Sequence, residues 1–176
     1  ASSSVGLASS QIVKAAGATA IATTRGNSKK QALLDAGADQ VIVTDEESLA
    51  ERVMEMTDGA GANIVFDPVV GPMLSDLAEA AAKGATIYVY GALSSEPAEY
   101  PLLAALGKGL SIRGYVLFEI TGDPAGLERA KRFVYDGLEA GDLRPIVART
   151  FPLDEIVEAH RYMESNQQIG KIVVLT

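Results

Sequence analysis

The alternation of short apolar runs with helical segments constrains the fold of this chain most. Runs of small and β-branched residues alternate with segments whose apolar residues recur at helical spacing. Parallel strands need crossover connections of this kind, and such crossovers are right-handed. The pattern therefore predicts an α/β fold in which helices cover both faces of a doubly wound parallel sheet.

Apolar periodicity and local end signals predict the elements. Strands are expected at 18–24, 39–43, 63–66, 85–90, 110–118, 146–150 and 171–176. Helices are expected at 5–16, 28–36, 45–56, 73–83, 124–140 and 153–165, with a short helix near Leu102.

Capping residues set the predicted helix ends. Gly17 is expected to end the first helix, and Asp123 to cap the long one at its start. Asn27 or Ser28 is expected to cap the second helix. Thr44 stands three residues before an acid, which is the spacing of a capping box for the third helix.

The chain opens with ASSSVG, and this stretch runs into the start of the first predicted helix. In a Rossmann fold, small residues in a G-x-G-x-x-G turn permit a tight bend, close approach to a pyrophosphate, and packing of helix on strand. Ala1, Ser3 and Gly6 occupy those positions here, and the hydroxyls of Ser3 and Ser4 suit a phosphate. The strand that should precede this turn is missing from the sequence. We therefore expect the chain to be part of a longer protein.

The end of the next strand predicts which dinucleotide binds. An acid there holds the ribose diol of NAD, whereas basic residues accommodate the 2′-phosphate of NADP. The stretch TTRGNSKK has no acid and groups Arg25, Lys29 and Lys30. This cluster predicts NADP(H), and the alternative is a solvent-exposed basic helix start.

Charge and composition exclude several classes of partner and site. A formal net charge of −8 disfavours nucleic acid or an anionic membrane as the main partner, and no apolar run reaches the length of a membrane span. The chain has no cysteine, which fits a reducing cytoplasmic compartment and excludes thiolate metal sites. The single histidine, His160, is expected at the surface or in packing, so we predict no metal site.

Several segments together resemble the cofactor-binding half of the medium-chain dehydrogenase/reductase superfamily. The similarity is to zinc-independent quinone oxidoreductases and alcohol dehydrogenase-like proteins. It rests on SSSVGLASSQIVKAAGA, TTRGNSKKQALLDAGAD, VFDPVVG, YVYGALS, IRGYVLFEI and HRYMESNQQIGKIVV. The resemblance implies that residues 1–176 are the NADP(H)-binding domain of an oxidoreductase that passes hydride to a quinone, an activated alkene or a carbonyl. It implies further that a separate GroES-like catalytic domain is absent from this sequence, so that the isolated chain binds cofactor with negligible turnover.

The resemblance implies cofactor contacts position by position, without a catalytic residue. The pyrophosphate is expected at Ser3, Ser4, Val5 and Gly6, and the adenosine phosphate at Thr24, Arg25, Lys29 and Thr44. The ribose and nicotinamide are expected at Asp67, Val69, Gly91, Ala92 and Leu93, and the rest of the cleft at Phe118 and Lys171. Val70 departs from the glycine common at its position, and a β-branched residue resists positive φ. Tyr90 and Tyr115 are expected in the core.

Other functions stay open at this point. The chain could be an enoyl reductase module of a larger synthase, or a dinucleotide-binding module without turnover. A methyltransferase-like fold for S-adenosylmethionine is a third reading, although TTR lacks the acid that such sites use on the ribose. The apolar segment 111–118 is expected at a sheet edge, where an unpaired strand favours a homodimer.

Overall fold

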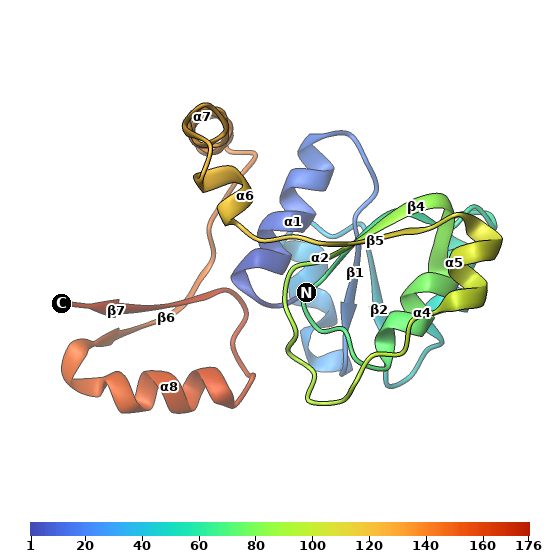
Figure 1. The fold of residues 1–176 in the computed structure, drawn as a ribbon. Coiled ribbons are helices and arrows are strands. Elements are labelled where there is room, and N and C mark those ends of the chain that lie inside the picture. The colour runs from blue at the N-terminus through green and yellow to red at the C-terminus, as the bar shows by residue number, and fades with distance from the viewer. The chain divides into compact units, whose positions relative to one another are not determined.

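The computed structural model describes residues 1–176, which form two compact units. The first unit comprises residues 1–46 and 131–176, and the second comprises residues 47–130. All strand pairs in both units are parallel, and helices connect the strands (Figure 1). The predicted α/β class with parallel sheets is confirmed.

The first unit contains two parallel strand pairs, β1 with β2 and β6 with β7. Its elements are α1 (Ser4–Ala15), β1 (Ile21–Thr24), the 3₁₀ helix η1 (Asn27–Lys29), α2 (Lys30–Asp35), β2 (Gln40–Val43), β6 (Val147–Pro152), the 3₁₀ helix η2 (Leu153–Glu155), α8 (Ile156–Glu164) and β7 (Lys171–Leu175). Leu7, Ala22, Leu33 and Val41 form its buried core, which packs α1 and α2 on the first strand pair. Helix α8 connects β6 to β7 and lies beside them (Figure 1).

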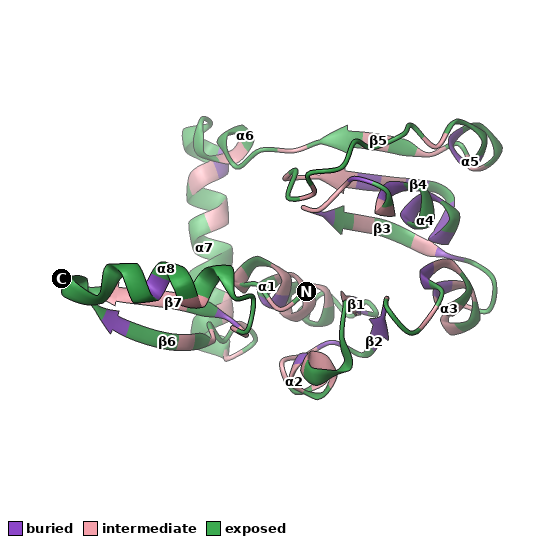
Figure 2. Ribbon diagram, turned by 90° about the horizontal axis from the view of Figure 1, so that it is seen from below, coloured by how far each residue is buried: buried purple, intermediate pink, exposed green.

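The second unit is built on one three-stranded sheet in the order β3-β4-β5. Its elements are α3 (Leu49–Met56), β3 (Ala62–Asp67), α4 (Met73–Ala80), β4 (Ala81–Val89), α5 (Leu102–Lys108), β5 (Ser111–Gly114) and α6 (Phe118–Thr121). Helix α7 (Pro124–Ala140) begins in this unit and ends in the first. Leu74, Ala78, Ile87 and Ala104 form a buried cluster, and Figure 2 shows buried residues gathered in α4 and β4.

Two predicted helix ends, Gly17 and Asp123, are confirmed, and Ser3 is a further cap that the sequence did not predict. The Ser3 hydroxyl accepts a hydrogen bond of 3.2 Å from the Gly6 N–H and caps α1. Gly17 follows α1 with a left-handed φ of 74°, as a C-terminal stop requires. The Asp123 carboxylate accepts from the Gly126 N–H at 2.9 Å and so caps α7.

Two predicted caps are wrong. Thr44 does not cap the third helix, because its hydroxyl donates to the Thr24 carbonyl of the neighbouring strand. Ser48 caps α3 instead and accepts from the Glu51 N–H at 3.4 Å. Neither Asn27 nor Ser28 acts as a cap, because both lie within η1, and α2 follows without a side-chain cap.

Two predicted boundaries also shift. The helix expected at 73–83 ends at Ala80, because Ala81, Ala82 and Ala85 are buried in the sheet and sheet packing outweighs the helix propensity of alanine. The strand expected at 110–118 pairs only as β5. Beyond it, the Glu119 carboxylate accepts from the Val116 N–H and α6 begins at Phe118.

Candidate functional site

The start of α1 leaves a backbone donor unused. Of the first-turn amides, Gly6 donates to the Ser3 hydroxyl and Leu7 donates to the Ser3 carbonyl at 3.0 Å. The Val5 N–H has no acceptor within the chain, and the Ser4 N–H faces the Gly170 carbonyl in the isolated bridge between Ser3 and Gly170. No acidic residue stands in this first turn. A free amide and the positive end of the helix dipole together suit an anion.

Gly6 lies where the helix comes closest to the start of the chain. A Cβ atom at this position would stand 2.4 Å from the carbonyl oxygen of Ala1, which no side chain can tolerate. This is the close approach expected of the last small residue in the turn. Val5 is 45% exposed beside it.

A segment near the C-terminus contacts this turn. The Gly170 N–H donates to the Ser2 carbonyl at 2.9 Å, and Ser3 and Gly170 form an isolated parallel bridge. Lys171 follows directly, and its N–H donates to Ile146 at 2.8 Å. Gly170, which the sequence did not single out, therefore contacts the turn directly. A role for its neighbour Lys171 in binding a cofactor stays a prediction.

Thr24, Arg25 and Thr44 come together at the carboxyl ends of β1 and β2. The Thr44 N–H and hydroxyl both donate to the Thr24 carbonyl, at 2.9 and 3.3 Å. The Asp45 N–H donates to the Arg25 carbonyl at 3.2 Å. The Arg25 guanidinium is exposed and makes no ion pair. In parallel sheets this edge is where ligands bind.

Lys29 is held by oxygen atoms of the protein itself. Its ammonium donates to the Ser2 hydroxyl at 3.0 Å, to the Gln168 carbonyl at 3.0 Å and to the Asn166 carbonyl. No carboxylate pairs with it. Partial burial, together with the nearby positive charge of Arg25, lowers the pKa of Lys29. The Asn166–Gln168 segment is a second feature missed from the sequence, where only the polar run SNQQIG hinted at a turn.

In the second unit, Asp67 ends β3 and organises the loop that follows. Its carboxylate is 5% exposed and accepts from the N–H groups of Val69 and Val70 at 2.9 and 2.8 Å. Val70 has a φ of 62°, and Gly71 continues with a φ of 60°. The left-handed backbone at this position is therefore kept with a valine in place of glycine, at a cost in local strain.

The loops after β3 and β4 pack against each other. The N–H of Leu93 donates to the Pro68 carbonyl and that of Ser94 to the Val69 carbonyl, both at 3.0 Å. A Cβ at Gly91 would stand 2.9 Å from the Pro68 carbonyl oxygen. Hydrogen bonds and close packing therefore join Asp67, Val69 and the 91–93 segment into one loop cluster, and its binding of a cofactor stays a prediction.

Aromatic and apolar side chains stand at or just beyond the ends of β3, β4 and β5. Leu93 is 77% exposed and Phe118 is 79% exposed, but the structure shows no contact that joins Phe118 to the loops. The Tyr90 ring stacks on Phe66 with centroids 3.9 Å apart, and Tyr115 lies 6.3 Å from Phe66. Burial, aided by the charge of Asp67, raises the pKa of Tyr90. The hydroxyl therefore stays protonated over a wider pH range than that of free tyrosine.

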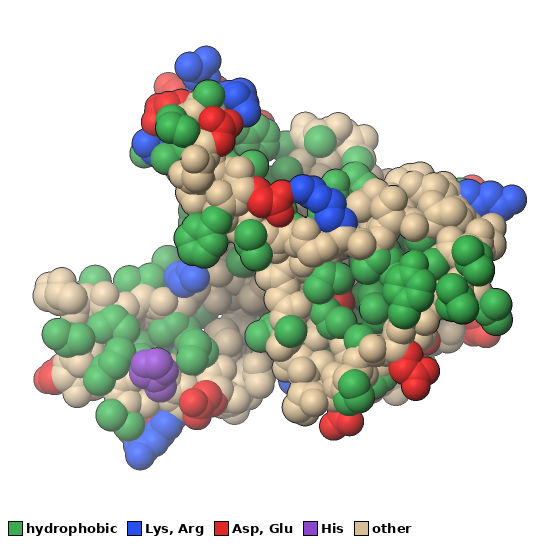
Figure 3. Space-filling model, viewed as in Figure 1, with side chains coloured by type: hydrophobic (Ala, Val, Ile, Leu, Met, Phe, Trp, Pro, Cys, Tyr) green, Lys and Arg blue, Asp and Glu red, His purple; other side chains and the backbone are tan.

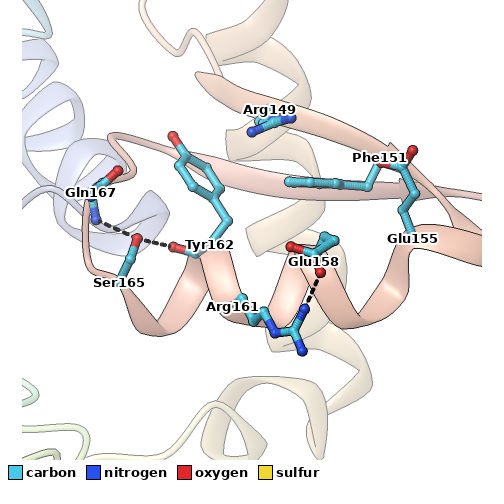
Figure 4. A pocket seen from close by; sticks show the side chains of 8 residues that line it. All are labelled: Arg149, Phe151, Glu155, Glu158, Arg161, Tyr162, Ser165 and Gln167. Atoms are coloured by element: carbon cyan, nitrogen blue, oxygen red, sulfur yellow. Dashed lines mark hydrogen bonds and ion pairs between the residues drawn. The ribbon is translucent and has the colours of Figure 1, made fainter.

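A cavity of about 500 Å³ lies apart from the predicted residues, between β6 and α8 (Figure 4). It is lined by Arg149, Phe151, Glu155, Glu158, Arg161, Tyr162, Ser165 and Gln167. The Arg149 guanidinium lies 4.6 Å from the centroid of Phe151 and 5.6 Å from that of Tyr162. His160 is exposed on α8 and does not line the cavity. Nor do three His, Cys, Asp or Glu side chains anywhere form a metal-binding group.

None of the helices combines the length and apolar character that a membrane span requires.

The sequence of residues 36–174 matches a family described as zinc-binding dehydrogenase, and the chain belongs to this family. The 2-haloacrylate reductase of a Burkholderia species is 29% identical over 161 residues, which cover 90% of this chain and 48% of the relative. The quinone oxidoreductase of Sus scrofa is 25% identical over 176 residues, or 99% of this chain and 52% of the relative. The highly reducing polyketide synthase ltbA of Aspergillus luteorubrus is 27% identical over 180 residues, or 99% of this chain and 6% of the synthase.

Solved structures show the same fold. Escherichia coli quinone oxidoreductase complexed with NADPH aligns with a TM-score of 0.88 at 27% identity, over 98% of this chain and 54% of that one. An NAD-dependent alcohol dehydrogenase aligns with a TM-score of 0.88 at 29% identity, over 100% of this chain and 49% of that one. The chain spans about half the length of the reductases and dehydrogenase that it matches.

Proposed function

We propose that this chain binds NADP(H) as the cofactor-binding domain of an oxidoreductase. The observation that carries the proposal is the free Val5 amide at the start of α1, beside the Ser4 amide and in the same unit as two cations that no carboxylate neutralises, Arg25 and Lys29. A free amide at a helix start suits a pyrophosphate, and an unpaired guanidinium suits a 2′-phosphate. The likeness to a quinone oxidoreductase complexed with NADPH supports the same assignment.

The residues present fit such a cofactor. The close approach at Gly6 leaves room for backbone rather than side chain at the turn, and the first turn of α1 holds no acid that would repel a phosphate. Thr24 and Thr44 offer hydroxyls at the carboxyl ends of β1 and β2. The residue immediately after Thr24 is not an acid, although an acid at that position is what binds the ribose diol of NAD. For the ribose and nicotinamide we propose the loop cluster of the second unit at Asp67 and Gly91.

When bound, the cofactor supplies a hydride for transfer to a quinone, an activated alkene or a carbonyl. The protein's own part is to bind and orient. The start of α1 would hold the pyrophosphate, and Arg25 would select the phosphorylated ribose. Asp67 fixes the loop after β3 through two backbone hydrogen bonds, so that Gly91 and Leu93 present their backbone in one arrangement. We assign no acid or base for proton transfer.

An enoyl reductase module is the second candidate for the whole protein. The match to a polyketide synthase over nearly all of this chain favours it. Both candidates share the cofactor and the hydride chemistry, and they differ in whether the alkene is carried by a larger synthase. An assay with a quinone and with an enoyl thioester separates the two.

Further parts of the proposal concern the surroundings of this domain. A separate catalytic domain would cover the nicotinamide, so that this chain alone turns over negligibly. The edge strand β5 and the exposed side chains of Val116, Leu117 and Phe118 favour a homodimer through 111–118. The exposed side chains of Leu102, Leu103 and Leu106 form a further hydrophobic surface on α5, the helix that precedes β5 (Figure 3). Because the chain has no cysteine, we place the protein in the cytoplasm.

Calorimetric titration with NADPH, NADH and S-adenosylmethionine tests the proposed ligand. NADPH is expected to bind most tightly. Arg25→Ala should weaken NADPH by about 1 to 3 kcal/mol and leave NADH nearly unchanged, because only the 2′-phosphate loses a charged hydrogen bond. Equal losses for both nucleotides, or preferred binding of S-adenosylmethionine, would contradict the assignment.

A further inference from the structure

We propose that Lys29 is a positioning residue that clamps the phosphate turn to the Asn166–Gln168 segment, and that Arg25 alone makes the contact that selects the 2′-phosphate. This inference rests on the proposed binding of NADP(H), and it divides between two basic residues a role that the sequence assigned to both. Lys29 would then contribute to the affinity for both NADPH and NADH, whereas Arg25 would contribute only to the affinity for NADPH.

All three N–H donors of the Lys29 ammonium are already in use. A lysine ammonium has three N–H donors and no acceptor. In the structure, Ser2, Asn166 and Gln168 provide three oxygen acceptors for them. A phosphate could therefore bind Lys29 directly only by displacing a bond that already exists.

The location of these acceptors explains what the clamp holds. Ser2 belongs to the phosphate turn, whereas Asn166 and Gln168 lie just past the end of α8. Asn166 adopts a φ of 55°, a left-handed conformation that asparagine tolerates. The carboxyl end of a helix also favours a cation.

A backbone connection runs beside the clamp. The Gly170 N–H donates to the Ser2 carbonyl at 2.9 Å, and a Cβ at Gly170 would stand 2.3 Å from the Ile146 carbonyl oxygen. Gly170 has a φ of 108°, so no other residue fits there easily. Lys29 thus holds the side chain of Ser2, and Gly170 holds its backbone. Ser2 directly precedes Ser3, the cap of α1.

Arg25 is free of such constraints. Its guanidinium is exposed and without an ion pair, and its charge is felt at Lys29, where it lowers the pKa of the ammonium. A planar guanidinium with free donors is suited to bind a phosphate in bidentate fashion. Of the two cations, only Arg25 has donors to spare for a ligand.

Titrations of NADPH and NADH into Arg25→Ala, Lys29→Met and Lys14→Met test the division. Lys29→Met keeps the apolar stem and removes the donors, and Lys14→Met is a matched control for the loss of one charge in the same unit, where Lys14 faces only Asp39. Circular dichroism confirms that each variant is folded at the titration temperature.

Lys29→Met should weaken NADPH and NADH by the same factor of about 10, because the turn that holds the shared pyrophosphate loosens. Arg25→Ala should weaken NADPH about 10- to 100-fold and spare NADH. A merely structural role for Lys29 would lower the melting temperature and leave the NADH affinity of the folded protein unchanged. That result, or a loss confined to NADPH in Lys29→Met, would overturn the inference.

Hydrogen exchange separates a failed clamp from a failed cofactor assignment. If the wild-type protein bound neither nucleotide, the proposed function would fall, and the clamp would still be measurable. Lys29→Met should speed exchange of the Gly170 amide, which bonds to Ser2, and leave the Ala38 amide of the same unit unchanged. Unchanged exchange at Gly170 would show that Lys29 does not hold the turn.

Discussion

The carboxylate of Asp67 accepts a hydrogen bond of 2.8 Å from the backbone N–H of Val70 and holds Val70 at a φ of 62°. A β-branched residue disfavours this left-handed backbone, so the loop keeps its shape through the carboxylate rather than through glycine. The same carboxylate accepts from Val69, which in turn accepts from Ser94 of the neighbouring loop. One buried side chain therefore sets the backbone on which the proposed nicotinamide contacts depend.

Asp67→Asn should destabilise the protein by about 1–3 kcal/mol, because the buried amide nitrogen would face one of the two part-buried N–H groups that now donate to the carboxylate. Urea denaturation followed by circular dichroism measures the change. Asp136→Asn, at an exposed position of α7, is the matched control and should change little. Equal stability of the wild type and Asp67→Asn would show that the carboxylate does not hold the loop.

Gly6→Ala should destabilise the protein by about 1–3 kcal/mol, because the new Cβ meets backbone that cannot give way. The displaced turn should also bind either nucleotide more weakly. Gly26→Ala is the control, since a Cβ there has nothing within 4 Å and its φ is −109°. Thermal unfolding compares the two, and a Gly6 variant as stable as the Gly26 variant would contradict the close approach.

Lys108→Met should lower the free energy of unfolding by about 1–2 kcal/mol. The Lys108 ammonium donates to the carbonyls of Ala78 and Ala81 at 3.1 Å, and to that of Glu79, where α4 ends. Its removal leaves these carbonyls without a charged partner. Lys83→Met, at an exposed position nearby in the chain, should stay close to the wild type in the same urea titration.

The pKa of Lys29 should lie below the ordinary value of 10.5, because partial burial and then the charge of Arg25 disfavour its ammonium. Between this lowered pKa and 10.5, the unfolded state binds more protons than the folded state, so this residue makes the free energy of unfolding rise with pH there. Titration of the Cε resonance by nuclear magnetic resonance measures the pKa. The rise of the free energy of unfolding with pH that Lys29 causes should vanish in Lys29→Met. A pKa of Lys29 at or above 10.5 would contradict a site without a carboxylate partner.

Local sequence signals predicted several helix ends, but they failed at α3, where two residues had the same capping pattern. Thr44 and Ser48 both stand three residues before a glutamate, and the sequence alone cannot decide between them. The structure decides because the Thr44 hydroxyl is already bonded to the strand beside it, which leaves Ser48 to cap α3. Asp123 had no such competitor, and its cap was predicted correctly.

The candidate site divides in the same way. Residues next to strand ends, such as Thr24, Arg25 and Asp67, were predictable because parallel strands present their carboxyl ends at one edge. The partners of Lys29 were not, since Asn166 and Gln168 lie far along the chain and act through backbone carbonyls, which leave no signature in the residue type. Phe118 was predicted from resemblance alone, and its role remains a proposal.

A crystal structure of the protein with NADPH would show directly where each phosphate group binds. We expect the pyrophosphate against the amides of Ser4 and Val5 and the 2′-phosphate against the guanidinium of Arg25. A nucleotide bound elsewhere on the protein, or a phosphate held by Lys29 while Arg25 points into solvent, would contradict this expectation.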